Sequence, residues 1–190
     1  MATGVQTVNQ VLTHGPARRQ RALDFGCGVG RLTYALATHF SQCVGVDISA
    51  EMVRRAQRDA PANCRFTTGS LAELEPRSFD LVLSLLVLQH IPSATERVRR
   101  LSELAQLVAP GGLLAFQVPG SIAWRNRFQV GARLYQLLRQ LGVPARRLYG
   151  TGLHPMRMGG ISPDRVSRSL AAAGCELTGF EAEVYYGIRR

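Results

Sequence analysis

The 190-residue chain contains no lysine, and all 23 of its basic residues are arginine. An arginine-rich genome would produce the same bias, so the formal net charge of +10 is weak evidence for a nucleic-acid partner. Aromatic residues make up only 7% of the chain, and WRNRF is the single place where arginines and rings alternate. A surface on which nucleic-acid bases stack is therefore not expected.

Long apolar runs and paired cysteines are also missing. No segment approaches the length of a membrane span, and the first twenty residues lack the pattern of a secretory signal. Cys27, Cys43, Cys64 and Cys175 are scattered without a CxxC pair, which excludes the usual spacing of a zinc site or a disulfide framework. We expect a cytoplasmic protein with no metal site and no membrane partner, either a monomer or a homodimer.

Acidic residues are absent over one long segment. None occurs between Glu103 and Asp164, whereas the segment holds seven arginines. These are Arg125, Arg127, Arg133, Arg139, Arg146, Arg147 and Arg157. A segment of one charge sign favours an anionic partner.

Apolar strand patterns alternate with helical patterns along the chain, which predicts one α/β domain over residues 1–190 with a parallel sheet. Strands are predicted at residues 21–25, 43–49, 64–69, 79–88 and 113–119, and one or two more within 175–190. Helices are predicted at residues 31–40, 49–60, 93–109, 121–142 and 162–174. The stretch 143–160 is expected to be irregular. Ligands of such sheets bind beyond the carboxyl ends of the strands, where the strand order reverses.

The sequence RALDFGCGVGRLT lies at such an end. Gly26, Gly28 and Gly30 permit backbone conformations that other residues rarely adopt, and the following helix directs its free N–H groups toward the turn. A dinucleotide-binding turn has the spacing GxGxxG, and here Arg31 occupies the place of its third glycine. This departure counts against a dinucleotide-dependent oxidoreductase.

Asp47 ends the second predicted strand. A carboxylate at this place can accept hydrogen bonds from both ribose hydroxyls of a nucleoside. The alternative is a helix N-cap, for which Ser49 is better placed.

Four segments in this order, LDFGCGVGRLT, VGVDIS, FDLVLSLLVLQHIP and LVAPGGLLAF, resemble the class I S-adenosylmethionine-dependent methyltransferases. The resemblance covers about half of the chain. It implies a Rossmann-like fold with a mostly parallel sheet of seven strands, helices on both faces and a helical insertion after the fifth strand. It also implies that the cofactor S-adenosylmethionine donates a methyl group and leaves as S-adenosylhomocysteine.

The resemblance assigns cofactor-binding roles to particular residues. Those near the methionyl and methyl part are Asp24, Gly26, Cys27, Gly28, Gly30, Ser84 and Leu85, and those around the ribose and adenine are Asp47, Ile48, Met52, Ser70 and Leu71. Many relatives carry an aspartate at the position of Ser70. A serine hydroxyl can also accept a hydrogen bond from the adenine amino group, but without the assistance of a charge.

The sequence predicts the acceptor site less well than the cofactor site. Residues 119–162 form an insertion that in this family usually covers the acceptor pocket. Its arginines would bind an anionic group of a small molecule, or they belong to a solvated helix whose apolar face carries Leu134, Leu137, Leu138 and Leu141. His90, after the fourth strand, is the candidate general base, and its alternative role is to shape the pocket.

We therefore expect a methyltransferase acting on a small molecule, and the first alternative is an RNA methyltransferase that uses the arginine-rich insertion. The chain lacks the Asn/Asp-Pro-Pro-aromatic loop of enzymes that methylate base amines, and no Pro-Cys follows the fourth strand. A cofactor-binding module without catalysis is a further alternative, since the acceptor site cannot be read from the residues.

Overall fold

The computed structural model describes residues 3–120, 130–151, 159–181 and 183–190. Its helices are α1 (Gly4–Leu12), α2 (Arg31–Ala37), α3 (Ala50–Arg58), α4 (Ala94–Leu107), α6 (Val130–Gln140), α7 (Ala145–Gly150) and α8 (Pro163–Ala172), with the short 3₁₀ helices η1 (Leu71–Glu73) and η2 (Leu88–His90). Its strands are β1 (Arg21–Phe25), β2 (Gln42–Val46), β3 (Cys64–Thr67), β4 (Phe79–Ser84), β5 (Val108–Gln117), β6 (Cys175–Glu181) and β7 (Val184–Arg189). In the described residues no helix is long and apolar enough to cross a membrane.

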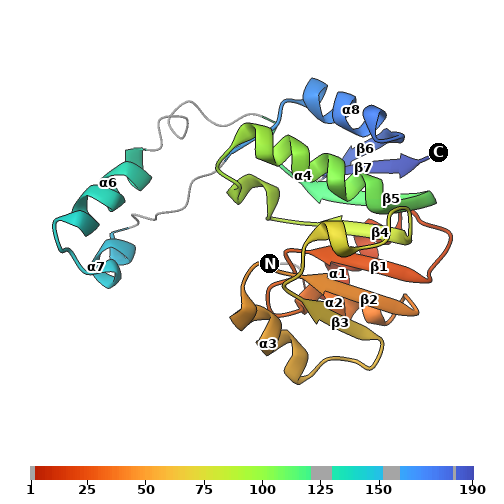
Figure 1. Ribbon diagram of the computed structural model, residues 1–190, viewed down its shortest axis with the longest axis horizontal. Coiled ribbons are helices and arrows are strands. Elements are labelled where there is room, and N and C mark those ends of the chain that lie inside the picture. The colour runs from red at the N-terminus through yellow and green to blue at the C-terminus, as the bar shows by residue number, and fades with distance from the viewer. Residues whose placement is uncertain (1–2, 121–129, 152–158, 182) are drawn as a thin grey trace.

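The strands form one sheet in the order β3-β2-β1-β4-β5-β7-β6 (Figure 1). The strands from β3 to β5 are parallel, and β7 runs antiparallel to both β5 and β6. The predicted mostly parallel sheet of seven strands is confirmed. The chain proceeds outward from β1 on one side and from β4 on the other, so the strand order reverses between these two strands.

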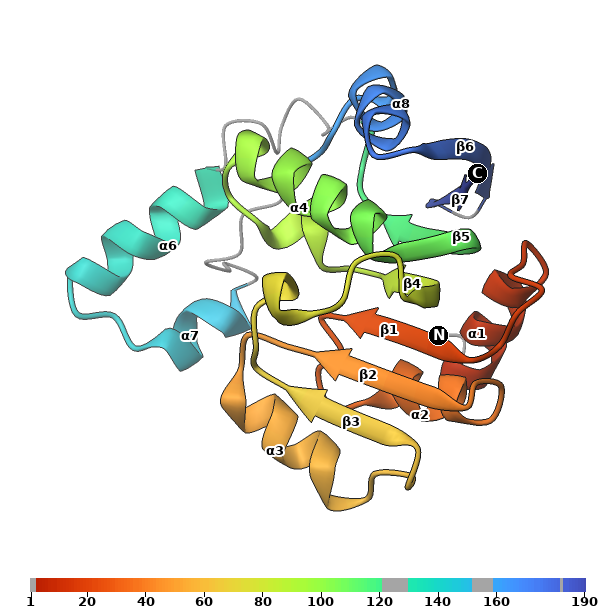
Figure 2. The same cartoon turned by 45° about the vertical axis from the view of Figure 1, so that its right-hand side comes forward.

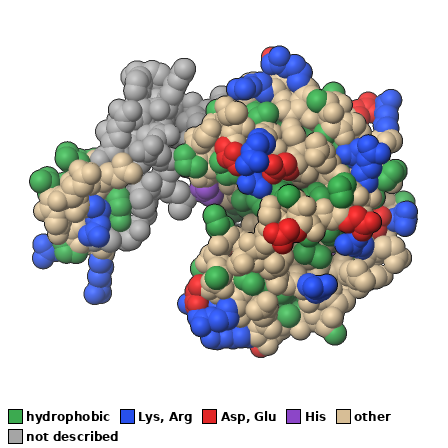
Figure 3. Space-filling view, viewed as in Figure 1, with side chains coloured by type: hydrophobic (Ala, Val, Ile, Leu, Met, Phe, Trp, Pro, Cys, Tyr) green, Lys and Arg blue, Asp and Glu red, His purple; other side chains and the backbone are tan. Residues whose placement is uncertain are grey.

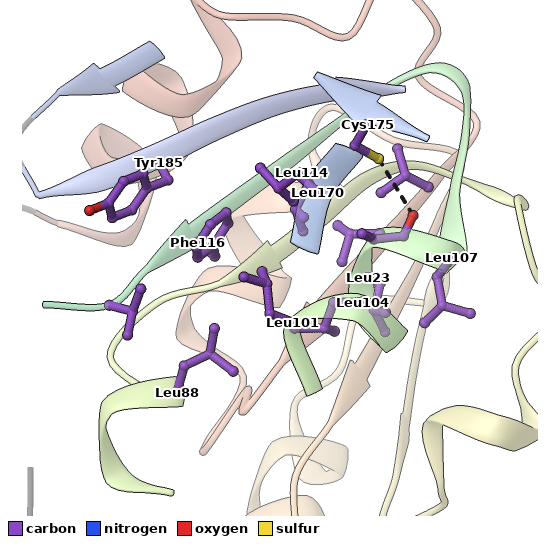
Figure 4. Packing of buried hydrophobic residues seen from close by; sticks show 14 of the residues in the cluster. Leu23, Leu88, Leu101, Leu104, Leu107, Leu114, Phe116, Leu170, Cys175 and Tyr185 are labelled. Carbon is purple, nitrogen blue, oxygen red and sulfur yellow. Dashed lines mark hydrogen bonds between the residues drawn. The ribbon is translucent and has the colours of Figure 1, made fainter. Parts of the chain in front are cut away.

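Both faces of the sheet are covered by helices. Along β5, Leu114 and Phe116 point into a core with α4 and α8, whereas Leu113 and Ala115 point into a core with α1 and α2. This alternation follows from the two-residue period of a strand. Figure 4 shows the first core, in which leucines of α4 meet side chains of the sheet and Leu170 of α8.

The strand β4 ends four residues earlier than the apolar pattern predicts. It stops at Ser84, and the next residues form a loop and the 3₁₀ helix η2. Leu86 has a φ of 61°, which a bulky residue rarely adopts, and Leu88 is fully buried in the core beneath α4. The apolar residues beyond Ser84 therefore reflect burial of this loop and not a longer strand.

The boundary between α4 and β5 also differs from the prediction. The helix ends at Leu107 and the strand begins at Val108, which lies opposite Phe79 across a register shift. Pro110 and Gly111 are thus part of a distorted strand, since tertiary pairing extends the strand through residues that look like a turn.

The expected insertion contains two described helices, α6 and α7. Of the predicted helix 121–142, residues 121–129 lie outside the described part, and Val130–Gln140 are helical. The stretch 143–160 is not wholly irregular, because Ala145–Gly150 form α7 after Pro144, whose carbonyl accepts from the N–H groups of Arg147 and Leu148. Figures 1 and 2 place α6 and α7 beyond the carboxyl edge of the parallel strands, away from the helices that cover the sheet.

Candidate functional site

The glycine turn after β1 is held by the backbone of β2. The N–H groups of Gly26 and Cys27 both donate to the carbonyl of Val46, at 2.7 and 3.1 Å. Gly26 has a φ of 81°, and a Cβ at this position would overlap the side chain of Val87. Gly28 has a φ of 55°, and a Cβ there would meet nothing within 4 Å. The turn therefore needs glycine for its conformation at both positions and for space at Gly26.

Asp47 connects this turn to the next helix. Its Oδ2 accepts from the N–H of Gly28 at 2.8 Å, and its Oδ1 accepts from the N–H of Ser49 at 2.8 Å. Ser49 caps α3 through its own hydroxyl, which accepts from the N–H of Met52. Each carboxylate oxygen keeps a further acceptor position. Asp47 is thus oriented, and it can still receive two hydroxyl groups.

A cavity of about 710 Å³ lies at this edge of the sheet, which is large enough for a nucleoside-sized ligand. Of the residues predicted from the sequence it brings together Gly26, Asp47, Ile48, Ser70, Leu71 and His90. The Ile48 side chain is fully exposed, an unusual state for an isoleucine that a bound ring would relieve. Ser70 caps η1, since its hydroxyl accepts from the N–H of Ala72 at 3.2 Å.

Seven predicted residues do not line this cavity: Asp24, Cys27, Gly28, Gly30, Met52, Ser84 and Leu85. Cys27 is buried among side chains of α3 and β3, and burial raises the pKa of its thiol to about 12. Ser84 is fully buried, and its hydroxyl has no hydrogen-bond partner in the described structure. Their roles toward a cofactor stay predictions.

Several residues that line the cavity were not among those predicted from the sequence. Val87, Ile91 and Pro92 follow β4, and Glu96 and Arg100 come from the first turns of α4. Arg100 pairs with Glu96 at 3.2 Å, and its guanidinium lies 5.8 Å from the ring centroid of Phe25. The position of Val87, Ile91 and Pro92 directly after β4 would have indicated that they line the site. Glu96 and Arg100 are brought to the site only by the placement of α4 in the fold.

Arg97 is a buried cation that the sequence analysis missed. Only 6% exposed, it donates to the carbonyls of Ile91 at 2.5 Å, Pro92 at 3.1 Å and Gly160 at 3.2 Å. The N–H of Gly159 also donates to the carbonyl of Gln89, at 2.7 Å. These bonds tie the loop beside the cavity to the chain that returns from α7. Burial lowers the pKa of Arg97.

Asp24 is a buried carboxyl at the carboxyl end of β1. It is 2% exposed, and the hydroxyl of Thr33 donates to its Oδ2 at 2.6 Å. Loss of water raises its pKa from 3.8 to about 6, an effect that the hydrogen bonds of Thr33 and the charge of Arg31 only partly offset.

This shift predicts a pH-dependent stability. The folded state favours the protonated carboxyl of Asp24. The contribution of this carboxyl to the free energy of unfolding is therefore fully present below pH 3.8 and is lost as the pH rises through about 6. Asp24→Asn should remove that slope and raise the free energy of unfolding at neutral pH, by at most about 3 kcal/mol. Urea unfolding of both proteins at a series of pH values checks this. Parallel stability curves for the two proteins would contradict it.

The comparison with protein families decides between the interpretations of this turn. Residues 23–116 match the family described as methyltransferase domain. The chain belongs to the class I S-adenosylmethionine-dependent methyltransferases. This range begins in β1, ends in β5 and includes the glycine turn, Asp47 and His90.

Two curated methyltransferases illustrate the similarity in sequence. The trans-aconitate 2-methyltransferase of Deinococcus radiodurans is 40% identical over 103 residues, which are 53% of this chain and 38% of that protein. The ubiquinone biosynthesis O-methyltransferase of Albidiferax ferrireducens is 34% identical over 108 residues, 53% of this chain and 42% of that protein. The chain thus spans less than half the length of these relatives.

Solved methyltransferase structures have the same fold over nearly the whole chain. Magnesium protoporphyrin IX methyltransferase from Synechocystis, crystallised with S-adenosylhomocysteine, gives a TM-score of 0.67 at 24% identity. The match covers 98% of this chain and 82% of that one. At this identity the likeness concerns the fold alone.

The methyltransferase cofactor fits the residues of this site. The cavity offers a two-oxygen acceptor in Asp47, an exposed apolar side chain in Ile48 and a backbone free of side chain at Gly26. In the described residues no group of histidine, cysteine or acidic side chains could hold a metal ion.

Proposed function

We propose that this protein transfers a methyl group from S-adenosylmethionine to a small-molecule acceptor. The observation that carries the proposal is the cavity at the carboxyl edge, where Asp47 is oriented by Gly28 and Ser49 and keeps acceptor positions for a ribose. Family membership and the names of the curated relatives support it.

The place of the acceptor is a second cavity in the described structure, of about 540 Å³. The loop after β4 contributes to both cavities, with Val87 and His90 on the cofactor cavity and Leu86 and Gln89 on the second. A group bound in the second cavity would therefore lie beside this loop, next to the cofactor cavity. The remaining lining residues are Gln117, Val118, Pro119, Gly120, Pro163, Phe180, Glu183 and Tyr185.

The second cavity favours an acceptor with an apolar or aromatic part. Phe180 is 60% exposed, its ring centroid lies 4.5 Å from that of Tyr185, and Tyr185 stacks on Phe116 at 5.3 Å. The Gln117 amide donates to the carboxylate of Glu183 at 3.2 Å. Flat apolar groups pack well against such rings.

An anionic group on the acceptor is the finer part of the proposal. It depends on the arginines of the insertion, since no arginine lines the second cavity among the described residues. Arg125, Arg127 and Arg157 lie outside the described part, and Arg139, Arg146 and Arg147 are exposed on α6 and α7. The support for an anionic acceptor is thus the one-signed charge of the segment.

The main task of the protein in this reaction is to position the cofactor and the acceptor. The cofactor supplies a methyl group on a sulfonium, which is already activated for in-line displacement. The chain must hold the two reactants in line and exclude water. Asp47 and the glycine turn fix one side, and the loop Leu86–His90, which contributes to both cavities, would lie where the two reactants meet. His90 would accept a proton from the acceptor where the acceptor must lose one.

Replacement of His90 separates catalysis from cofactor binding. His90 lines the cofactor cavity from the end of η2 and is exposed. His90→Ala should leave the affinity for S-adenosylhomocysteine nearly unchanged and lower kcat roughly a hundredfold or more if the side chain is the base. Calorimetry and a pH–rate profile check this, and loss of the acidic limb of the profile would identify a base. An unchanged kcat would exclude this role.

The proposed function is tested with methyl-labelled S-adenosylmethionine and a host extract divided into small-molecule, RNA and protein fractions. We expect label in the small molecules. Label in RNA would instead identify an RNA methyltransferase that uses the arginine segment. Binding of S-adenosylhomocysteine without transfer to any fraction would indicate a cofactor-binding module.

A further inference from the structure

The helix α6 presents an apolar stripe that nothing described in the structure covers. Leu134 and Leu137 of α6, and Leu141 in the turn directly after it, are 40%, 53% and 71% exposed. Their spacing of three and four residues places them with the half-buried Leu138 on one face of the helix. Tyr135, at a different angle on the same helix, is only 9% exposed. The helix therefore buries another side and exposes its leucines.

The other exposed large apolar residues are accounted for differently. Ile48, Leu86 and Phe180 line the two cavities, where ligands would cover them. Val5 and Val29 are isolated, and single exposed apolar residues are normal on a protein surface. The α6 stripe is a row of leucines outside both cavities, and such a row indicates an interaction surface.

The charge around the stripe is of one sign. Arg139, Arg146 and Arg147 are exposed on α6 and α7, and no acidic residue occurs between Glu103 and Asp164. On the face drawn in Figure 3, hydrophobic and cationic side chains lie together on the lobe formed by α6 and α7, and no acidic side chain is visible there. The surface thus combines leucines with cations and would attract an anionic partner.

We propose that the α6–α7 lobe docks onto an anionic lipid bilayer. An amphipathic helix with leucines on one face, in a lobe whose exposed charges are arginines, is suited to lie in the headgroup region, with the leucines inserted and guanidinium groups of the lobe attracted to the lipid phosphates. Arginine stems can reach past an inserted apolar face to the interface. This departs from the expectation of no membrane partner, because the sequence could not tell whether the leucines would be covered.

The position of the α6–α7 lobe determines which side of the molecule would face a bound bilayer. Figures 1 and 2 show α6 and α7 beyond the carboxyl edge of the parallel strands, the edge that carries both cavities. A bilayer bound through the lobe would therefore lie on the same side of the molecule as the site. The proposal rests on the exposed stripe and its charge, and not on the identity of the methyl acceptor.

The test is sedimentation of the full chain with two kinds of vesicle, pure phosphatidylcholine and phosphatidylcholine mixed with phosphatidylglycerol. We expect binding to the anionic vesicles only, weakened by added salt. Leu137→Ser with Leu141→Ser should weaken it at least about tenfold, as should Arg146→Gln with Arg147→Gln. Val5→Ser, and Arg58→Gln with Arg65→Gln, change exposed residues elsewhere on the protein and should have no effect.

Other occupants of the stripe give different results. If a second copy of the chain covers it, light scattering will show a dimer that the leucine variant dissociates, without vesicle binding by the parent. If the surface binds RNA, the arginine variant will lose RNA binding and the leucine variant will not. Either result, or vesicle binding that both variants retain, overturns the proposal. Calorimetry with S-adenosylhomocysteine, expected to be unchanged in all variants, tests the cofactor site separately.

Discussion

Asp47→Ala is expected to weaken the binding of S-adenosylhomocysteine about a hundredfold or more. Both ribose hydroxyls would lose a charged acceptor, and hydrogen bonds to charged groups contribute about 1.5–3 kcal/mol each. The variant also frees the N–H groups of Gly28 and Ser49, which Asp47 holds at 2.8 Å, so the turn itself loosens. Isothermal titration calorimetry measures the affinity, and circular dichroism shows whether the variant is folded.

Two matched variants make this result specific. Asp47→Asn keeps the size of the side chain but turns an amide N–H toward one of the two backbone donors, so we expect a loss of about tenfold. Asp59→Ala removes an exposed carboxylate at the end of α3 that does not line the cavity, and it should bind normally. An unchanged affinity of a folded Asp47→Ala protein would show that the ribose assignment is wrong.

Gly26→Ala is expected to destabilise the protein by about 3 kcal/mol or more. The added Cβ meets Val87, a stiff β-branched side chain, and the φ of 81° adds strain of about 1–2 kcal/mol. Gly28→Ala is the matched control, since its φ of 55° is also strained but its Cβ would be free of contacts. It should cost only about 1–2 kcal/mol. Urea unfolding of both variants gives the difference.

Val87→Ala tests the cause of that difference. Removing the two methyl groups relieves the overlap at Gly26, so the double variant should recover part of the stability that Gly26→Ala loses. The same change in a Gly28→Ala background should recover nothing. Equal destabilisation by the two glycine variants would mean that the loop after β4 moves aside freely, and that Val87 does not fix the turn.

Local patterns in the sequence predicted most of the sheet and the cofactor edge. The apolar run Leu113 to Phe116 and the helix cap at Ser49 act within a few residues, so they can be read without the fold. The end of β4 could not be read this way. Residues 85–88 are apolar because the loop and η2 are buried against the core, and the same pattern fits a longer strand equally well.

The sequence by itself determined the alternating α/β order, the glycine turn, the carboxylate at Asp47 and the acid-free arginine segment. These depend on backbone preferences and on composition, which each stretch of chain carries with it. Only the tertiary structure decided that Val87 closes on Gly26, that Arg97 joins Ile91 to Gly160, and that the leucines of α6 stay exposed. Such contacts join residues far apart in the chain, and which partners meet is set by the packing of the whole molecule.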